Sequence, residues 1–364
     1  MLLWLDASLA SVHFAGDPQS LSGLENLLLS CFNGNHLLVG DRATIKALRA
    51  IVTGRREVSV LDKIYNQLPE LIGFTKTLDF RVRVTDTSAP EGWAGTERTI
   101  WLSRFAHLTP FCTVLLAENL IDANLYIFAA RHYVSHSRTK GVNISLEPRG
   151  GGGNTISVEF ENIAKHFNHF CICVTDSDRL TPHCSPSDTA KQCAKISNTS
   201  NWIVCHHCLD ARELENIIPL TCYEQSLDAG SAAKIEKILE ITTVSPNVRD
   251  FLDIKDGSVV RSIFAFPVAS PKRQFWEQAI ETINAAGLAE IPCLGQGQCS
   301  NPETCVCVVH SGLGRNALSQ VLHWLNSNSI PKTLEAFRGA EGVSWLAIGK
   351  KIYEWGVAQV PTRI

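Results

Sequence analysis

The chain has 364 residues and a mass of 40.0 kDa, which is more than one ordinary domain holds, so its length predicts two or three domains. Hydrophobic residues make up 45% of the sequence and charged residues 19%, which excludes a disordered chain, a collagen and a coiled coil. The formal charge of 33 − 36 = −3 provides no global basic field, so any nucleic-acid binding must come from a local site.

The cellular compartment is indicated by the first residues and by the cysteines. The opening MLLWLDASLASVHF lacks a basic segment and carries Asp6 inside its apolar run, which argues against a signal peptide. The apolar runs are far shorter than the roughly 18–20 residues that cross a bilayer. Thirteen cysteines without an export signal indicate a reducing compartment. We therefore expect a soluble, cytoplasmic protein that does not enter a membrane.

In chain order, the pattern of apolar residues predicts three segments. Residues 1–105 mix short apolar runs with helical patches and predict an N-terminal α/β domain of unknown role. Residues 106–225 alternate strand-like runs with helical patterns, and residues 226–364 are mostly helical. The predicted strands of the middle segment are Phe111–Ala117, Val142–Leu146, Phe170–Thr175 and Trp202–Cys205, with helices over Leu120–Val134, Ile156–Phe167, Asp188–Ile196 and Ala211–Ile218. This order predicts an α/β fold around a central parallel sheet.

Acidic residues follow three of the four predicted strands. They are Glu118 and Asp122 after the first strand, Asp176 and Asp178 after the third, and Glu213 and Glu215 after the fourth. Because the carboxyl ends of parallel strands meet at one edge of a sheet, we expect these carboxylates to gather there. Carboxylates so close together repel one another unless cations lie between them, and Mg²⁺ or Mn²⁺ suits such oxygen ligands. Two ions at this edge would support the hydrolysis of a phosphodiester.

The second predicted strand is followed by Arg149 and a run of four glycines, residues 150–153. Glycines let backbone amides approach a ligand closely, and a helix is predicted to begin directly afterwards. The run is not a P-loop, because no Gly-Lys-Ser/Thr follows it, so an ATPase of that type is not expected. The candidate phosphate contacts near the strand ends are Arg149, Gly151, Gly152, Arg179 and Lys191.

The order of these motifs resembles the TOPRIM domain of topoisomerases, bacterial primases and nucleases. The motifs are LLAENLIDA around Glu118, GGGGNT, CVTDSD around Asp176, and RELENIIP around Glu213. They are most similar to the nuclease branch typified by the OLD (overcoming lysogenisation defect) proteins. The resemblance covers roughly residues 106–222, and the flanking segments match no family. The sequence departs from the family pattern at Asn119, where glycine usually stands, and in lacking an ATPase domain.

The resemblance implies a Mg²⁺- or Mn²⁺-dependent nuclease acting on DNA or RNA, as the effector of a prokaryotic anti-phage defence system. In it Glu118 acts at the base or metal position, Asp176 and Asp178 are the principal ligands, and the remaining carboxylates complete the shell of a second ion. An ATPase or sensor protein acting in trans is the partner that it implies, and a homo-oligomer stays open. The alternatives are a catalytically degenerate TOPRIM scaffold or sensor that binds a partner protein, and a primase-like nucleotidyl transferase, for which no nucleotide or template site is evident.

A second motif lies in the helical C-terminal segment. Cys293, Cys299, Cys305 and Cys307 form a C-x5-C-x5-C-x-C pattern in a loop rich in Gly, Gln, Asn and Pro. A loop with so few core-forming residues needs a cross-link, and four thiolates around Zn²⁺ would supply one. The spacing is not the usual pair of CxxC motifs, so reduced thiols or redox-active pairs remain the alternative.

Overall fold

The computed structural model describes residues 1–107, 112–166, 169–288 and 305–362. Contacts divide the chain into two compact units. Unit 1 comprises residues 1–173, 195–206 and 347–364, and unit 2 comprises residues 174–194 and 207–346. The segment 106–225 contributes to both units, since the last residues of its third strand and the loops that follow are assigned to unit 2.

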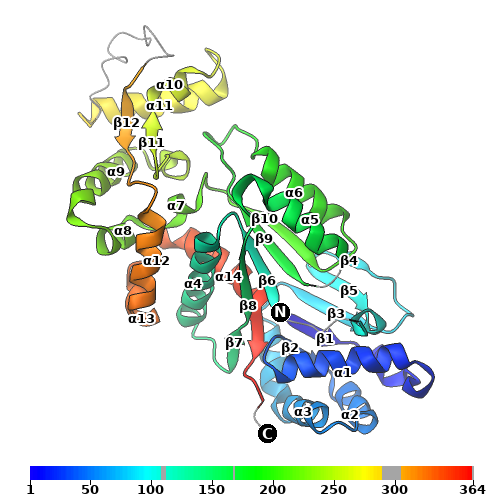
Figure 1. Ribbon diagram of the computed structural model, residues 1–364. Helices are drawn as coiled ribbons and strands as arrows, with labels where there is room; N and C mark the ends of the chain where they lie inside the picture. Colours follow the sequence, from blue (N-terminus) through cyan, green and yellow to red (C-terminus); the bar gives the residue numbers. More distant parts are fainter. Residues whose placement is uncertain (108–111, 167–168, 289–304, 363–364) are drawn as a thin grey trace. The chain divides into compact units, whose positions relative to one another are not determined.

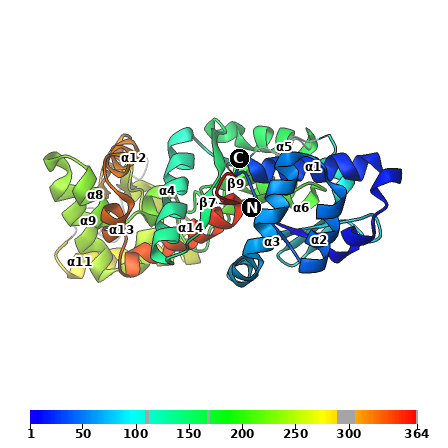
Figure 2. The same ribbon diagram turned by 90° about the horizontal axis from the view of Figure 1, so that it is seen from below.

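The N-terminal part of unit 1 is built on a five-stranded sheet of order β2-β1-β3-β5-β4. Its inner strands pair in parallel and only β4 is antiparallel. The strands are β1 Leu2–Leu5, β2 Leu37–Gly40, β3 Arg81–Thr85, β4 Gly92–Ala94 and β5 Glu97–Trp101; the helices are α1 Pro18–Phe32, α2 Arg42–Ile51 and α3 Arg55–Thr75. Helices α1 and α3 pack on each other and on β2 (Figures 1 and 2). The predicted α/β character of residues 1–105 is confirmed.

The second sheet has the order β10-β9-β6-β8, and β6 pairs in parallel with both β9 and β8. Its strands are β6 Thr113–Ala117, β8 Leu146–Gly150, β9 Cys171–Thr175 and β10 Val204–Cys208; the helices of this region are α4 Leu120–His136, α5 Ile156–His166, α6 Asp188–Thr199 and α14 Val343–Gly356. Every residue of β6 and β9 is buried, as expected of inner parallel strands covered on both faces. The central parallel sheet of the prediction is therefore confirmed, and Cys171 and Cys173 are buried in β9.

The second strand of this sheet begins later than predicted. The apolar residues β7 Val142–Ile144 pair instead with β13 Val357–Gln359 in a separate antiparallel sheet. The sheet strand β8 includes Pro148 and Arg149, which follow the predicted strand Val142–Leu146. Proline is tolerated because β8 is an edge strand with one neighbour. The predicted helix Ala211–Ile218 was also wrong, since only α7 Leu214–Ile217 is helical.

Gly150 ends β8 against the turn that opens α4. A Cβ atom there would lie 2.9 Å from the Leu120 nitrogen and 3.2 Å from the Asn119 carbonyl carbon, and neither backbone atom can move aside cheaply.

We expect Gly150→Ala to lower the free energy of unfolding by about 1–3 kcal/mol, because it overpacks this contact. Gly73→Ala is the control: Gly73 is exposed within α3, nothing lies within 4 Å of its added methyl, and the change should raise stability by up to about 1 kcal/mol. Chemical denaturation measures both. If both substitutions changed the free energy of unfolding equally, the close packing at Gly150 would contribute nothing to stability.

Unit 2 is mostly helical, with the short antiparallel pair β11 Gly257–Val259 and β12 Val308–Ser311. Its helices after α7 are α8 Leu220–Ser226, α9 Ala232–Val244, α10 Val260–Phe264, α11 Pro271–Ala285, α12 Ala317–Ser327 and α13 Ile330–Glu335. Buried isoleucines at Ile235, Ile238 and Ile241 give α9 an apolar face. Across the described ranges, no helix combines the length and low polarity that crossing a membrane requires.

Candidate functional site

The candidate site residues fall in both units. Unit 1 holds Glu118, Asp122, Arg149, Gly151 and Gly152; unit 2 holds Asp176, Asp178, Arg179, Lys191, Glu213 and Glu215.

In unit 1, Asn119 follows Glu118 directly and is the residue that precedes α4. Its side chain caps α4 by accepting the Asp122 N–H at 3.0 Å and donates to Asp122 Oδ2 at 2.6 Å. Asp122 is only 5% exposed, whereas Glu118 is half-buried. The carbonyl of Glu118 accepts the Gly153 N–H at 2.9 Å, so the glycine run fixes the backbone that presents the Glu118 carboxylate.

The candidate phosphate contacts of unit 1 have partners inside the chain. The Gly151 amide donates to the Ala117 carbonyl at 2.7 Å, and Arg149 contacts Glu147 at 2.7 Å and Glu159 at 3.8 Å. Gly152 is exposed with φ 74°, a left-handed conformation that suits glycine. A phosphate at Arg149 would therefore have to displace a carboxylate.

The two acidic motifs of unit 2 are joined by hydrogen bonds. The amides of Ser177 and Asp178 both donate to the Arg212 carbonyl, at 3.0 and 2.9 Å. The Leu214 N–H donates to Asp176 Oδ1 at 3.1 Å. The structure thus brings Asp176 to the beginning of α7, beside the motif that carries Glu213 and Glu215, as the sequence analysis expected of these two motifs.

Asp178 differs from Asp176 in its surroundings. It is exposed and has φ 53°, a region that aspartate enters more readily than most residues. Of the two candidate cations of this unit, Arg179 donates to the Asp210 carbonyl at 3.2 Å, and Lys191 pairs with Asp188 at 3.0 Å on α6.

Glu213 and Glu215 are buried, with 8% and 4% of their surface exposed. Arg212 lies 3.5 Å from Glu213 and binds Asp253 at 2.7 Å, so its charge is shared between two carboxylates. Burial raises the pKa of Glu213 to about 7; Arg212 opposes the shift, and Glu215 and Asp253 add to it. Glu213 Oε2 is a buried atom with no hydrogen-bond partner among the described residues.

We compared the chain with known proteins by sequence and by structure. No family model, curated protein or solved structure matches it.

The sequence analysis missed Lys255, which lies in the electrostatic reach of the acidic motifs of unit 2. Burial alone would lower the pKa of Lys255, but Glu215 and Glu213 hold it above the ordinary value, with Asp176 also contributing. Lys255 follows the motif by about forty residues in a segment with no motif of its own, so only the fold reveals it. A cation beside three carboxylates can neutralise charge on them or on a bound phosphate.

The metal sites of the sequence analysis lack a preformed ligand group. Among the residues that the structure describes, no three His, Cys, Asp or Glu side chains are grouped so that they could hold an ion. Of the proposed zinc cysteines, Cys305 and Cys307 precede β12, whereas Cys293 and Cys299 lie outside the described residues. The four-cysteine zinc loop therefore stays a prediction.

Proposed function

We propose that the protein is a divalent-metal-dependent nuclease that hydrolyses phosphodiester bonds of DNA or RNA. The supporting observation is the junction in unit 2, where Leu214 donates to Asp176 and the Ser177 and Asp178 amides meet at the Arg212 carbonyl. Two acidic motifs more than thirty residues apart in sequence are thereby held together by the backbone. Such a rigid arrangement of acidic side chains suits the positioning that phosphoryl chemistry demands.

The donor set fits Mg²⁺ or Mn²⁺. It consists of carboxylate oxygens, and the buried Glu213 Oε2, which has no hydrogen-bond partner among the described residues, is a ligand atom that a cation would satisfy. Mg²⁺ commonly binds through one or two carboxylates together with waters and substrate phosphates, so a group of three protein ligands is not required. The bound ion would activate water and stabilise the leaving oxygen.

Each side chain has an assigned role in this proposal. Asp176 and Asp178 are the principal ligands, Glu213 and Glu215 serve a second ion, and Lys255 offsets charge on the phosphate. In unit 1, the family resemblance assigns the half-buried Glu118 to the base or metal position and makes Asp122, which also holds the Asn119 cap, a candidate metal ligand.

The direct test is cleavage of plasmid, linear DNA and tRNA by the full chain with Mg²⁺, with Mn²⁺ and with EDTA. We expect cleavage with either metal and none with EDTA. Cleavage that persists in EDTA would contradict metal dependence. The variant Asp176→Asn tests whether the acidic residues are responsible for the cleavage.

One observation favours a second candidate function, a catalytically degenerate scaffold or sensor. Arg149 and the Gly151 amide, which a phosphate would use, already bind groups of the chain itself. Calorimetric titration with Mn²⁺ distinguishes the two functions. The nuclease predicts binding that Asp176→Asn weakens, whereas the scaffold predicts no binding at millimolar Mn²⁺.

The cellular role that we propose comes from the family resemblance. The nuclease would be the effector of a prokaryotic anti-phage defence system, acting in the cytoplasm with an ATPase or sensor protein in trans, and a structural Zn²⁺ would hold the cysteine loop. An ATPase partner is proposed because the sequence contains no P-loop.

A further inference from the structure

A serine and a histidine form a buried pair in the small sheet of unit 2. Ser258 on β11 is the register partner of His310 on β12, so their side chains share one face. Ser258 Oγ lies 3.1 Å from His310 Nε2, and the two residues are 7% and 2% exposed. Neither residue belongs to the acidic site.

The hydrogen bonds fix which atom carries each proton. His310 Nδ1 lies 3.1 Å from the Ser311 carbonyl, which can only accept, so Nδ1 is protonated and Nε2 is the acceptor. Ser258 Oγ–H therefore donates to Nε2, while the Asp253 N–H donates to Oγ at 2.9 Å. Burial lowers the pKa of His310, which keeps its imidazole neutral and able to accept a proton at neutral pH.

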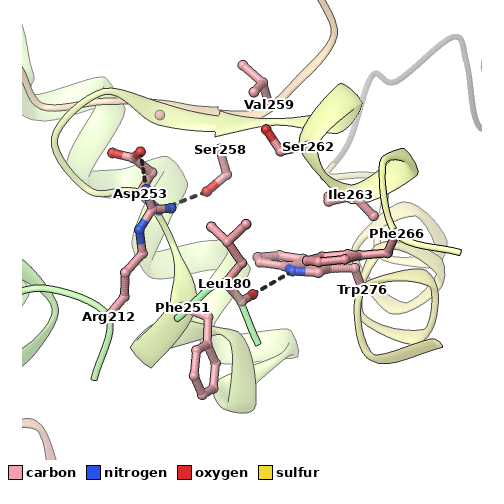
Figure 3. A pocket seen from close by; sticks show the side chains of 11 residues that line it. Leu180, Arg212, Phe251, Asp253, Ser258, Val259, Ser262, Ile263, Phe266 and Trp276 are labelled. Atoms are coloured by element: carbon pink, nitrogen blue, oxygen red, sulfur yellow. Dashed lines mark hydrogen bonds and ion pairs between the residues drawn. The ribbon is translucent and has the colours of Figure 1, made fainter. Parts of the chain in front are cut away.

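Ser258 lines a cavity of about 70 Å³. Arg212, Asp253 and Ser258 lie at one end of it, and the rings of Phe266 and Trp276 lie at the other (Figure 3). The volume is about half that of the roughly 150 Å³ cavity that is known to hold benzene. It therefore suits a small apolar group such as an acetyl or propionyl chain and is too small for a longer one.

We propose that Ser258 is a nucleophile, activated by His310, that reacts with small carboxylic esters whose acyl group enters this cavity. A nucleophile, a base oriented by a third group and an apolar pocket are the components of covalent acyl transfer. Arg212 lines the same end of the cavity as Ser258 and is ion-paired with Asp253 at 2.7 Å, so this end is polar.

The reaction balances without a further reagent. Ser258 Oγ bonds to the carbonyl carbon and its proton moves to His310 Nε2; the carbon–oxygen bond to the alcohol breaks, and the alcohol leaves with that proton. Water then attacks the acyl carbon, gives one proton to Nε2 and releases the carboxylic acid, and Nε2 returns the proton to Ser258 Oγ.

Covalent labelling tests this site. The full chain is treated with methanesulfonyl fluoride, which is small enough for the cavity, and its peptides are mapped by mass spectrometry. We expect sulfonylation of Ser258 at least about 100-fold faster than that of Ser262, because general-base assistance contributes about 10²–10⁴-fold. Ser262 is the matched control, since it lines the same cavity but is exposed and belongs to no serine–histidine pair that the structure shows.

The variants give a second measurement. His310→Gln should slow labelling of Ser258 to the Ser262 rate, and p-nitrophenyl acetate should be hydrolysed faster than p-nitrophenyl octanoate. Equal labelling rates of Ser258 and Ser262 in the wild-type chain would overturn the proposal, and this measurement does not depend on the folding of a variant. A labelling rate of Ser258 that His310→Gln leaves unchanged would also overturn it. The labelling is carried out in EDTA, in which the proposed nuclease is inactive, so the result does not depend on nuclease activity.

Discussion

Asp176→Asn should reduce metal-dependent cleavage at least about 100-fold, the loss typical of removing one charge-stabilising group from an active site. The substitution removes the negative charge but leaves an oxygen in the same place. Asn Oδ1 can still accept the Leu214 N–H that Asp176 accepts at 3.1 Å, so the junction between the two motifs should survive. The measurement is the initial rate of plasmid cleavage at saturating Mn²⁺, together with the thermal midpoint of each protein.

Asp188→Asn is the matched control for this experiment. Asp188 begins α6, which follows the loop that carries Asp176, but it is solvent-exposed and pairs with Lys191 at the surface. Its cleavage rate should stay within about twofold of the wild type, because exposed ion pairs contribute little. If Asp176→Asn cleaved at the Asp188→Asn rate, Asp176 would be excluded as a ligand.

Asp178→Asn separates a ligand role from a backbone role. Asparagine tolerates the left-handed conformation that Asp178 adopts, so this change should leave stability unaltered. A loss of cleavage in Asp178→Asn would then be due to the missing charge.

The inner strands could be predicted because their signal is local. The buried runs TVLLA and CICVT are apolar except for one terminal threonine in each, and both form strands of the parallel sheet. The strand β8 gave no such signal, since it contains Pro148 and Arg149 and its residues are only partly buried at the sheet edge. The prediction places the strand over the more apolar Val142–Leu146, but Val142–Ile144 pairs with β13, which lies more than 200 residues away.

The acidic site could be predicted only in part. The placement of Asp176 and Glu213 after two predicted parallel strands indicated that they lie close together, and the Leu214–Asp176 hydrogen bond shows that their motifs meet. The influence of Glu213 and Glu215 on the pKa of Lys255 comes from the fold, and no pattern in the sequence indicates it. The pairing of Ser258 with His310 spans 52 residues, and only the register of β11 and β12 reveals it.

The charge of Glu213 should make the stability of the protein depend on pH. The folded pKa is about 7 and the ordinary value is 4.5, so the folded state binds this proton more tightly than the unfolded state. Below pH 4.5 both states are protonated and there is no penalty; stability then falls as the pH rises, and the full penalty is present above pH 7. The shift corresponds to about 3 kcal/mol at most, since each pKa unit is worth about 1.4 kcal/mol.

Glu213→Gln removes the titrating group and should therefore stabilise the protein at pH 8 by up to about 3 kcal/mol relative to its effect at pH 4.5. Denaturant unfolding at pH 4.5, 6, 7 and 8 measures this difference. The exposed Glu236 on α9 provides the control, and Glu236→Gln should produce no pH-dependent difference. If the free energies of unfolding of Glu213→Gln and wild type differed by the same amount at every pH from 4.5 to 8, the proposed penalty for burying the charged Glu213 would be contradicted.

Denaturant unfolding at pH 8 in the presence of Mn²⁺ tests whether the buried charge of Glu213 belongs to a metal site. A divalent ion at the acidic site would compensate the buried charge of Glu213, so Mn²⁺ should stabilise the wild type and have less effect on Glu213→Gln. If Mn²⁺ stabilised both proteins equally, the ion would bind elsewhere and Glu213 would be a destabilising buried acid without a metal partner. Stabilisation of the wild type that Asp176→Asn also diminishes would show that Asp176 and Glu213 both contribute to metal binding, as the proposed hydrolysis requires.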